Sequence, residues 1–159
     1  GRQAYEDCAV KDRLNHAISG MLSAKPYDIQ SAVERLMKER NEIKEQLVET
    51  KKKLFALKRD CIDKDVKCAV LFEDDIEPFD MRVLTETILE KIPSAAVLSG
   101  NEENGYKYCI GSATADVQAF VKEANKMLNG RGGGRGNMAQ GSFAAKASDI
   151  ERCIRNGMD

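Results

Sequence analysis

Residues 130–143 read GRGGGRGNMAQGSF, and five of the first seven of these residues are glycine. Arg131 and Arg135 stand on either side of three consecutive glycines. Glycine has no Cβ, so such a stretch permits positive φ angles and close approach of another backbone. A row of exposed N–H groups can hold an anion, and a guanidinium offers a planar, permanently charged fork that suits phosphate. Composition alone leaves two interpretations of residues 130–136 open, a phosphate-binding loop and a flexible turn that follows a helix.

The segments around this loop predict an α/β domain. Two short apolar runs flank an amphipathic stretch, and the order strand–helix–strand implies a parallel pair joined by a right-handed crossover. A turn, NEENG, then leads into an alternating strand that forms a hairpin with the second run. The expected strands are 68–72, 94–99, 106–112 and 138–143, and the expected helices are 81–92, 116–129 and 149–156. We therefore expect residues 67–159 to form a mixed sheet of about four strands flanked by helices.

The first part of the chain predicts a long helical hairpin or coiled-coil segment over residues 1–66. Proline at position 26 interrupts a first helix that ends near residue 22, and a second helix runs from about 28 to 63. Apolar residues recur along the second helix with the 3.5-residue period of a coiled-coil seam. We expect this seam to make a homodimer, while packing within one chain remains the alternative. The seam residues are Val33, Leu36, Ile43, Leu47, Leu54 and Leu57.

Several classes of function find no support in the residues. The glycines do not form GxxxxGK followed by Ser or Thr, so a P-loop is excluded. Residues 134–139 match GxGxxA, but a dinucleotide-binding fingerprint must follow a strand and open a helix, whereas this one follows a helix. His16 is the only histidine, and the five cysteines contain no CxxC pair, so neither a metal site nor a histidine-based catalytic centre is expected. No apolar run is long enough to cross a membrane.

Charge is unevenly distributed along the chain, although the net charge is only −1. Residues 68–121 contain three basic and ten acidic side chains, whereas residues 122–159 contain seven basic and four acidic ones. This asymmetry indicates one face that attracts a polyanion and another that avoids it.

The segment GRGGGRGNMAQGSF resembles the GGGR-x-x-MAQ-G segment of alanyl-tRNA synthetases and of their freestanding AlaX editing relatives. In that family it lies in the DHH-associated C-terminal domain. Three further segments also resemble segments of the family and follow the same order along the chain. They are the opening GRQAYED, the charged helix ERLMKERNEIKEQLVETKKKL and the hairpin VLSGNEENGYKYCIGS. Two departures occur, because Gly136-Asn137 stands where the family often has Pro-Asp, and Gly141-Ser142 replaces a frequent Ala-Gly. The related DHH phosphoesterases carry a histidine after the glycines, where this chain has Arg135.

The resemblance implies an accessory domain for tRNA binding and dimerisation, in a large AlaX-type editing protein or in an alanyl-tRNA synthetase. It implies a fragment of a longer cytoplasmic enzyme, with no catalytic centre and no cofactor of its own, since zinc belongs to the editing domain. The expected partners are tRNA, in particular tRNA-Ala, and a second copy of the chain, with no membrane. Two alternatives stay open, a purely structural dimerisation domain and the nucleic-acid-binding half of a DHH-type phosphoesterase. The expected RNA-binding residues are Arg131, Gly132, Gly133, Gly134, Arg135, Asn137, Gln140, Lys122, Lys126 and Lys146.

Overall fold

A computed structural model describes the backbone of residues 2–158 and the side chains of residues 6–158. The chain divides into two compact units, residues 1–51 and residues 52–159.

The first unit consists of helices that bury almost nothing. Helix α1 is Arg2–Leu22, a 3-10 turn η1 covers Pro26–Asp28, and helix α2 is Ile29–Cys61. The last ten residues of α2 belong to the second unit. Among the described side chains of residues 6–51, Ala32 alone is buried. The two long helices expected before the α/β domain are therefore confirmed, but this part of the chain has no core of its own.

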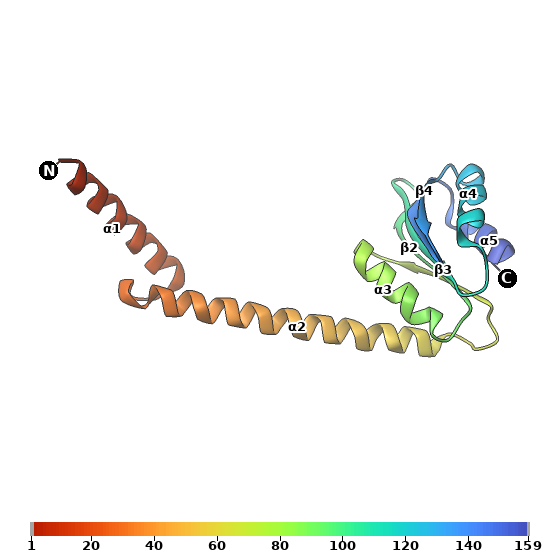
Figure 1. Cartoon of the computed structure of the whole chain (residues 1–159), viewed down its shortest axis with the longest axis horizontal. Coiled ribbons are helices and arrows are strands. Elements are labelled where there is room, and N and C mark those ends of the chain that lie inside the picture. The colour runs from red at the N-terminus through yellow and green to blue at the C-terminus, as the bar shows by residue number, and fades with distance from the viewer. Residues whose placement is uncertain (1, 159) are drawn as a thin grey trace. The chain divides into compact units, whose positions relative to one another are not determined.

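The second unit is a five-stranded mixed sheet with helices on both faces, which confirms the α/β fold class. The strand order is β1-β2-β3-β5-β4, in which β1 and β2 are parallel and the other neighbours are antiparallel. Figure 1 shows α3 on one side of the sheet and α4 and α5 on the other. The strands are β1 Cys68–Glu73, β2 Ser94–Asn101, β3 Gly105–Ser112, β4 Arg131–Arg135 and β5 Met138–Phe143; the helices are α3 Pro78–Leu89, α4 Val117–Met127 and α5 Ala147–Met158.

Each face of the sheet has its own hydrophobic core. Leu84 and Ile88 of α3 pack on one face with Val97 and Cys109 of the sheet, and Phe55 of α2 joins this cluster. The other core lies under α4 and α5, and its members include Val121, Ile150, Ile154, Tyr108, Ile110, Ala139 and Phe143. Alternate residues of β3 therefore serve opposite cores, as the two-residue period of a strand requires.

The glycine-rich stretch differs from its prediction, because Arg131–Arg135 is an edge strand rather than a loop. It pairs antiparallel with β5 over its whole length. Glycine has low intrinsic strand propensity, so its sequence favours a turn. Here the missing Cβ atoms let β4 lie against β5 where side chains would collide, and this tertiary contact overrides the local preference.

Candidate functional site

Both arginines of β4 project from the same face of the sheet. Arg131 lies opposite Ser142, Gly133 opposite Gln140, and Arg135 opposite Met138. Opposed residues of antiparallel strands share a face, and Met138 packs against the core beneath α3. The arginines therefore stand on the α3 side, four residues or about 13 Å apart along the strand. Gly133 lies between them and has no side chain.

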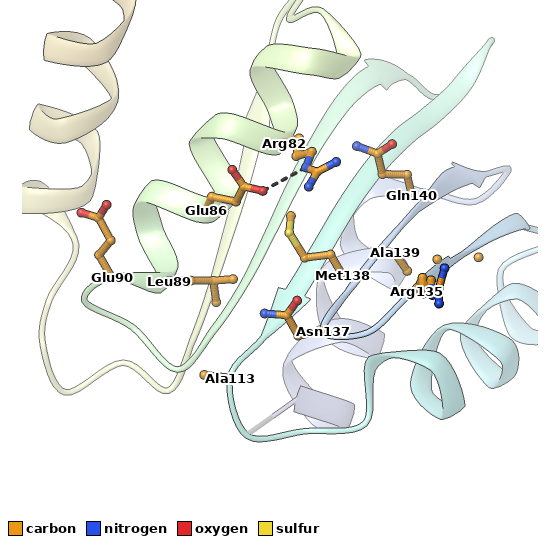
Figure 2. A pocket seen from close by; sticks show the side chains of 12 residues that line it. Arg82, Glu86, Leu89, Glu90, Ala113, Arg135, Asn137, Met138, Ala139 and Gln140 are labelled. Atoms are coloured by element: carbon orange, nitrogen blue, oxygen red, sulfur yellow. Dashed lines mark hydrogen bonds and ion pairs between the residues drawn. The ribbon is translucent and has the colours of Figure 1, made fainter.

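An open groove of about 630 Å³ runs between α3 and the end of β4 that carries Arg135. Figure 2 shows Arg82 and Glu86 on the helix side of this groove, with Met138 and Gln140 on the strand side. A second groove, of about 610 Å³, lies at the opposite end of β4, and its lining includes Arg131, Lys107 and residues of the acidic loop that precedes α3. The first groove is lined by Arg82, Glu86, Leu89, Glu90, Ala113, Gly133, Gly134, Arg135, Asn137, Met138, Ala139 and Gln140.

The two arginines of β4 are unusual in this unit because their side chains have no partner. Residues 52–158 contain six arginines. Four of them form ion pairs, namely Arg59 with Glu90, Arg82 with Glu86, Arg152 with Asp149 and Arg155 with Glu151. The side chains of Arg131 and Arg135 are exposed and make no ion pair or hydrogen bond with any residue that the structure describes. Two permanent positive charges are thus available to an external anion.

Arg82, which lines the first groove, differs from the arginines of β4 because its charge is paired. Arg82 Nε donates to Glu86 Oε1 at 2.9 Å. This hydrogen bond, together with the charge of the carboxylate, raises the pKa of Arg82. The positive charge of Arg82 is therefore neutralised within α3, whereas the charge of Arg135 across the groove has no such partner among the described residues.

The glycines of β4 differ in what the fold requires of them. A Cβ at Gly132 or Gly134 would collide with the main chain of β5, so these two positions must be glycine. Gly136 has φ +69° and opens the two-residue turn to β5, as the first position of a type II′ turn requires. A Cβ at Gly133 would meet no atom within 4 Å. The bare backbone at Gly133 therefore serves no packing purpose and leaves the strand accessible beside Gln140.

The structure brings some of the expected RNA-binding residues together and separates others. Asn137 and Gln140 line the same groove as Arg135. Lys122 and Lys126 lie on α4, which covers the opposite face of the sheet, and Lys146 directly precedes α5 on that side. Lys126 is also paired with Glu123 at 2.7 Å. The three lysines therefore form no common surface with the arginine face of β4.

Two amide side chains that the sequence interpretation missed lie against β4. Gln118 and Asn125 of α4 donate hydrogen bonds to main-chain carbonyls of the β4–β5 hairpin. They stand seven residues apart, which is two turns along one helix face. The sequence could have indicated these two residues, because their spacing places both on one face of α4, beside its apolar stripe.

Comparison with known families matches residues 65–155 to the DHHA1 domain. The chain belongs to the DHHA1 family. The matched range contains the whole sheet, both grooves and the two arginines of β4. The family resemblance predicted from the glycine–arginine segment is confirmed.

Curated relatives of this DHHA1 chain are alanine–tRNA ligases. It is 27% identical to the ligase of Granulibacter bethesdensis, over 99% of this chain and 19% of the relative. It is also 27% identical to the ligase of Clostridioides difficile, over 96% of this chain and 18% of the relative. The chain thus spans about a fifth of the length of the relatives it matches.

Solved structures share the fold of this DHHA1 chain. The C-Ala domain of Aquifex aeolicus alanyl-tRNA synthetase matches with a TM-score of 0.52 and 20% identity, over 59% of this chain and 92% of that domain. RecJ of Thermus thermophilus in complex with Mg²⁺ matches with a TM-score of 0.58 and 18% identity, over 83% of this chain and 20% of RecJ. These likenesses agree with the expected fold of the domain.

Within residues 2–158, no cluster of three or more His, Cys, Asp or Glu side chains has a geometry that could hold a metal ion. None of the helices in this range is both long and apolar enough to span a membrane.

Proposed function

We propose that this DHHA1 chain is an accessory tRNA-binding and dimerisation domain of an alanyl-tRNA synthetase or of an AlaX-type editing protein. The supporting observation is the pair of unpartnered arginines, Arg131 and Arg135, that flank the bare backbone of Gly133 beside an open groove. The parent enzyme supplies the chemistry, and this cytoplasmic fragment supplies affinity and orientation without a cofactor.

The arrangement suits a phosphodiester chain. Arginine binds phosphate through a planar fork of donors, and two such forks on one strand would hold two points of an RNA backbone. The side-chain amide of Gln140 has both donor and acceptor groups for a ribose or a base edge, and Gly133 leaves room to approach it. Sequence-specific RNA recognition favours unpaired bases that can be reached in this way.

Replacing both arginines by alanine tests the tRNA-binding role. We expect the affinity of Arg131→Ala, Arg135→Ala for tRNA-Ala to fall at least about tenfold, because two charge-assisted contacts are lost. The slope of log affinity against log salt should become shallower by about 1.5, since fewer counterions are released. Arg152→Ala is the matched control, because Arg152 is exposed but paired with Asp149 on α5.

The result also separates the alternatives. Unchanged affinity and an unchanged salt slope would contradict the arginine site and favour a purely structural dimerisation domain. Preferential binding of short oligodeoxynucleotides over tRNA would favour the nucleic-acid-binding half of a DHH-type phosphoesterase.

A second copy of the chain is the proposed partner of α2. The seam residues of α2 are 39–64% exposed. A helix that is amphipathic yet unpacked gains most of its stability from a partner. We infer that two copies join along this seam. The seam residues are Val33, Leu36, Ile43, Leu47, Leu54 and Leu57.

A further inference from the structure

Arg131 and Arg135 lie on β4, a strand with few stabilising contacts of its own. Three of the five residues of β4 are glycine, all five are exposed, and β4 pairs with β5 alone. Glycine also leaves the backbone freer in the unfolded chain, so ordering it costs more entropy than ordering other residues. Something outside the strand must therefore limit its motion if Arg131 and Arg135 are to keep a fixed separation.

Two amides of α4 provide that restraint through the main chain. Asn125 Nδ2 donates to the carbonyl oxygen of Gly132 at 3.2 Å, directly after Arg131. Gln118 Nε2 donates to the carbonyl oxygens of Gly136 at 3.3 Å and Met138 at 3.2 Å, across the turn that follows Arg135. The two helix side chains thus hold the two ends of β4.

The orientation of the Asn125 amide and the main chain that carries Gln118 are both held by further hydrogen bonds. The Tyr108 hydroxyl donates to Asn125 Oδ1 at 3.3 Å, which leaves Asn125 Nδ2 to face Gly132. Tyr108 is buried and its ring stacks on Phe143 with centroids 4.2 Å apart. Gln118 lies at the start of α4, where the side chain of the N-cap Asp116 accepts from the Gln118 backbone N–H at 3.0 Å. The Asn125 amide is therefore held in place by Tyr108, and the main chain of Gln118 is held by the helix cap.

We propose that Asn125 and Gln118 are positioning residues, Asn125 for Arg131 and Gln118 for Arg135. They act through the main chain of β4 and need not touch the ligand. This inference rests on the proposed function, because the arginines matter only if they bind an anionic partner.

A double-mutant cycle on the full chain, with tRNA-Ala as the probe, tests the pairing of amide with arginine. Asn125→Ala and Gln118→Ala should each weaken binding about fivefold, the effect of one ordinary hydrogen bond. Asn125→Ala should add nothing in the Arg131→Ala background and keep its full effect in the Arg135→Ala background. Gln118→Ala should show the reverse pattern. A general loss of structure would lower affinity equally in both backgrounds, and that result would overturn the proposal.

Isosteric variants and a control sharpen the cycle. Asn125→Asp keeps the acceptor for Tyr108 but removes the donor to Gly132, so it should weaken binding as much as alanine does. Wild-type affinity in Asn125→Asp would overturn the role of the donor. Asn156→Ala removes an exposed amide of α5 and should leave affinity unchanged.

Hydrogen exchange separates this inference from the proposed function. The β4 amides that bond to β5 should exchange at least fivefold faster in Asn125→Ala and Gln118→Ala, with or without tRNA. If Arg131→Ala and Arg135→Ala leave tRNA affinity unchanged, the proposed function fails. Hydrogen exchange then tests by itself whether Asn125 and Gln118 restrain β4. Unchanged protection of the β4 amides in both Asn125→Ala and Gln118→Ala would overturn the proposed restraint.

Discussion

The three consecutive glycines of β4 have different physical roles. Gly132 and Gly134 lie where any side chain would collide with β5, whereas Gly133 opens onto free space between the two arginines. A single sequence run therefore combines a packing requirement with a surface that the fold leaves uncovered.

Alanine substitutions separate these roles. Gly134→Ala should lower the free energy of unfolding by about 2 kcal/mol or more, because the new Cβ overlaps the Met138 carbonyl. Gly133→Ala should change it by less than about 1 kcal/mol. Gly133→Ala should nevertheless weaken tRNA binding, since the methyl group stands on the arginine face. Chemical denaturation and a binding titration measure both effects, and wild-type affinity in a folded Gly133→Ala would show that no ligand approaches this position.

Tyr108 gives the domain a pH dependence on the alkaline side. Burial raises the pKa of Tyr108, against a smaller opposing effect of the hydrogen bond to Asn125. The folded protein thus holds the phenolic proton more tightly than the unfolded chain. This contribution to stability is complete below about pH 10, the pKa of an unperturbed tyrosine, and is lost as pH rises through the folded value. Burial raises the pKa of Cys109 as well, so the contribution of this thiol to stability is also lost as pH rises.

We expect the free energy of unfolding to decline above about pH 10, and the decline to be smaller in Tyr108→Phe. Urea titrations between pH 8 and pH 11 measure the slope. Equal slopes in the two proteins would contradict a raised pKa of Tyr108.

At the scale of elements, α2 presents an apolar seam that the described part of the chain does not cover. Ile43 and Leu47 are 64% and 52% exposed. If a second copy covers them, a charge placed there must be desolvated in the dimer, which is costly.

Ile43→Asp, Leu47→Asp should therefore sediment as a monomer at concentrations where the native chain is a dimer. Glu45→Ala, on the side of the helix away from the seam, is the control and should remain dimeric. A native chain that sediments as a monomer would contradict dimerisation through α2.

The elements differ in how far the sequence specified them. The apolar runs of β1 and β2 and the turn before β3 predict the parallel pair and the hairpin, because burial and turn chemistry act locally there. Helix α3 begins at Pro78, three residues earlier than predicted, since proline is well suited to the first helical position. Strand β4 was missed because its existence depends on β5, and glycine carries no local signal for a strand. Gln118 and Asn125 were missed for a related reason, since a polar helix face does not indicate which carbonyls it will reach.

At the scale of the whole molecule, the α/β unit extends into α2. Phe55 is buried in the core beneath α3, and Lys58 forms an ion pair with Glu73 of β1. Lys91 Nζ donates to the carbonyl oxygens of Arg59, Asp60 and Ile62, which closes the C-terminal end of α2. These contacts favour a domain boundary after residue 51 over the boundary after residue 66 that the sequence predicts.

Truncation decides between the two boundaries. Residues 52–159 should unfold in one cooperative transition and be more stable than residues 67–159 by about 3 kcal/mol, because the shorter fragment loses Phe55 and its neighbours. Phe55→Ala in the full chain should show a loss of similar size. Equal melting temperatures for the two fragments would support the boundary after residue 66.

The open edge of β4 has a consequence for solubility. An exposed edge strand offers unpaired main-chain groups to any other strand, and two copies of β4 could in principle join their sheets. An antiparallel pairing centred on Gly133 would set Arg131 of one copy directly opposite Arg135 of the other. Like charges opposed across strands are destabilising. Arg131 and Arg135 should therefore oppose the joining of two sheets along β4, and we expect a chain that lacks both arginines to aggregate more readily at high concentration.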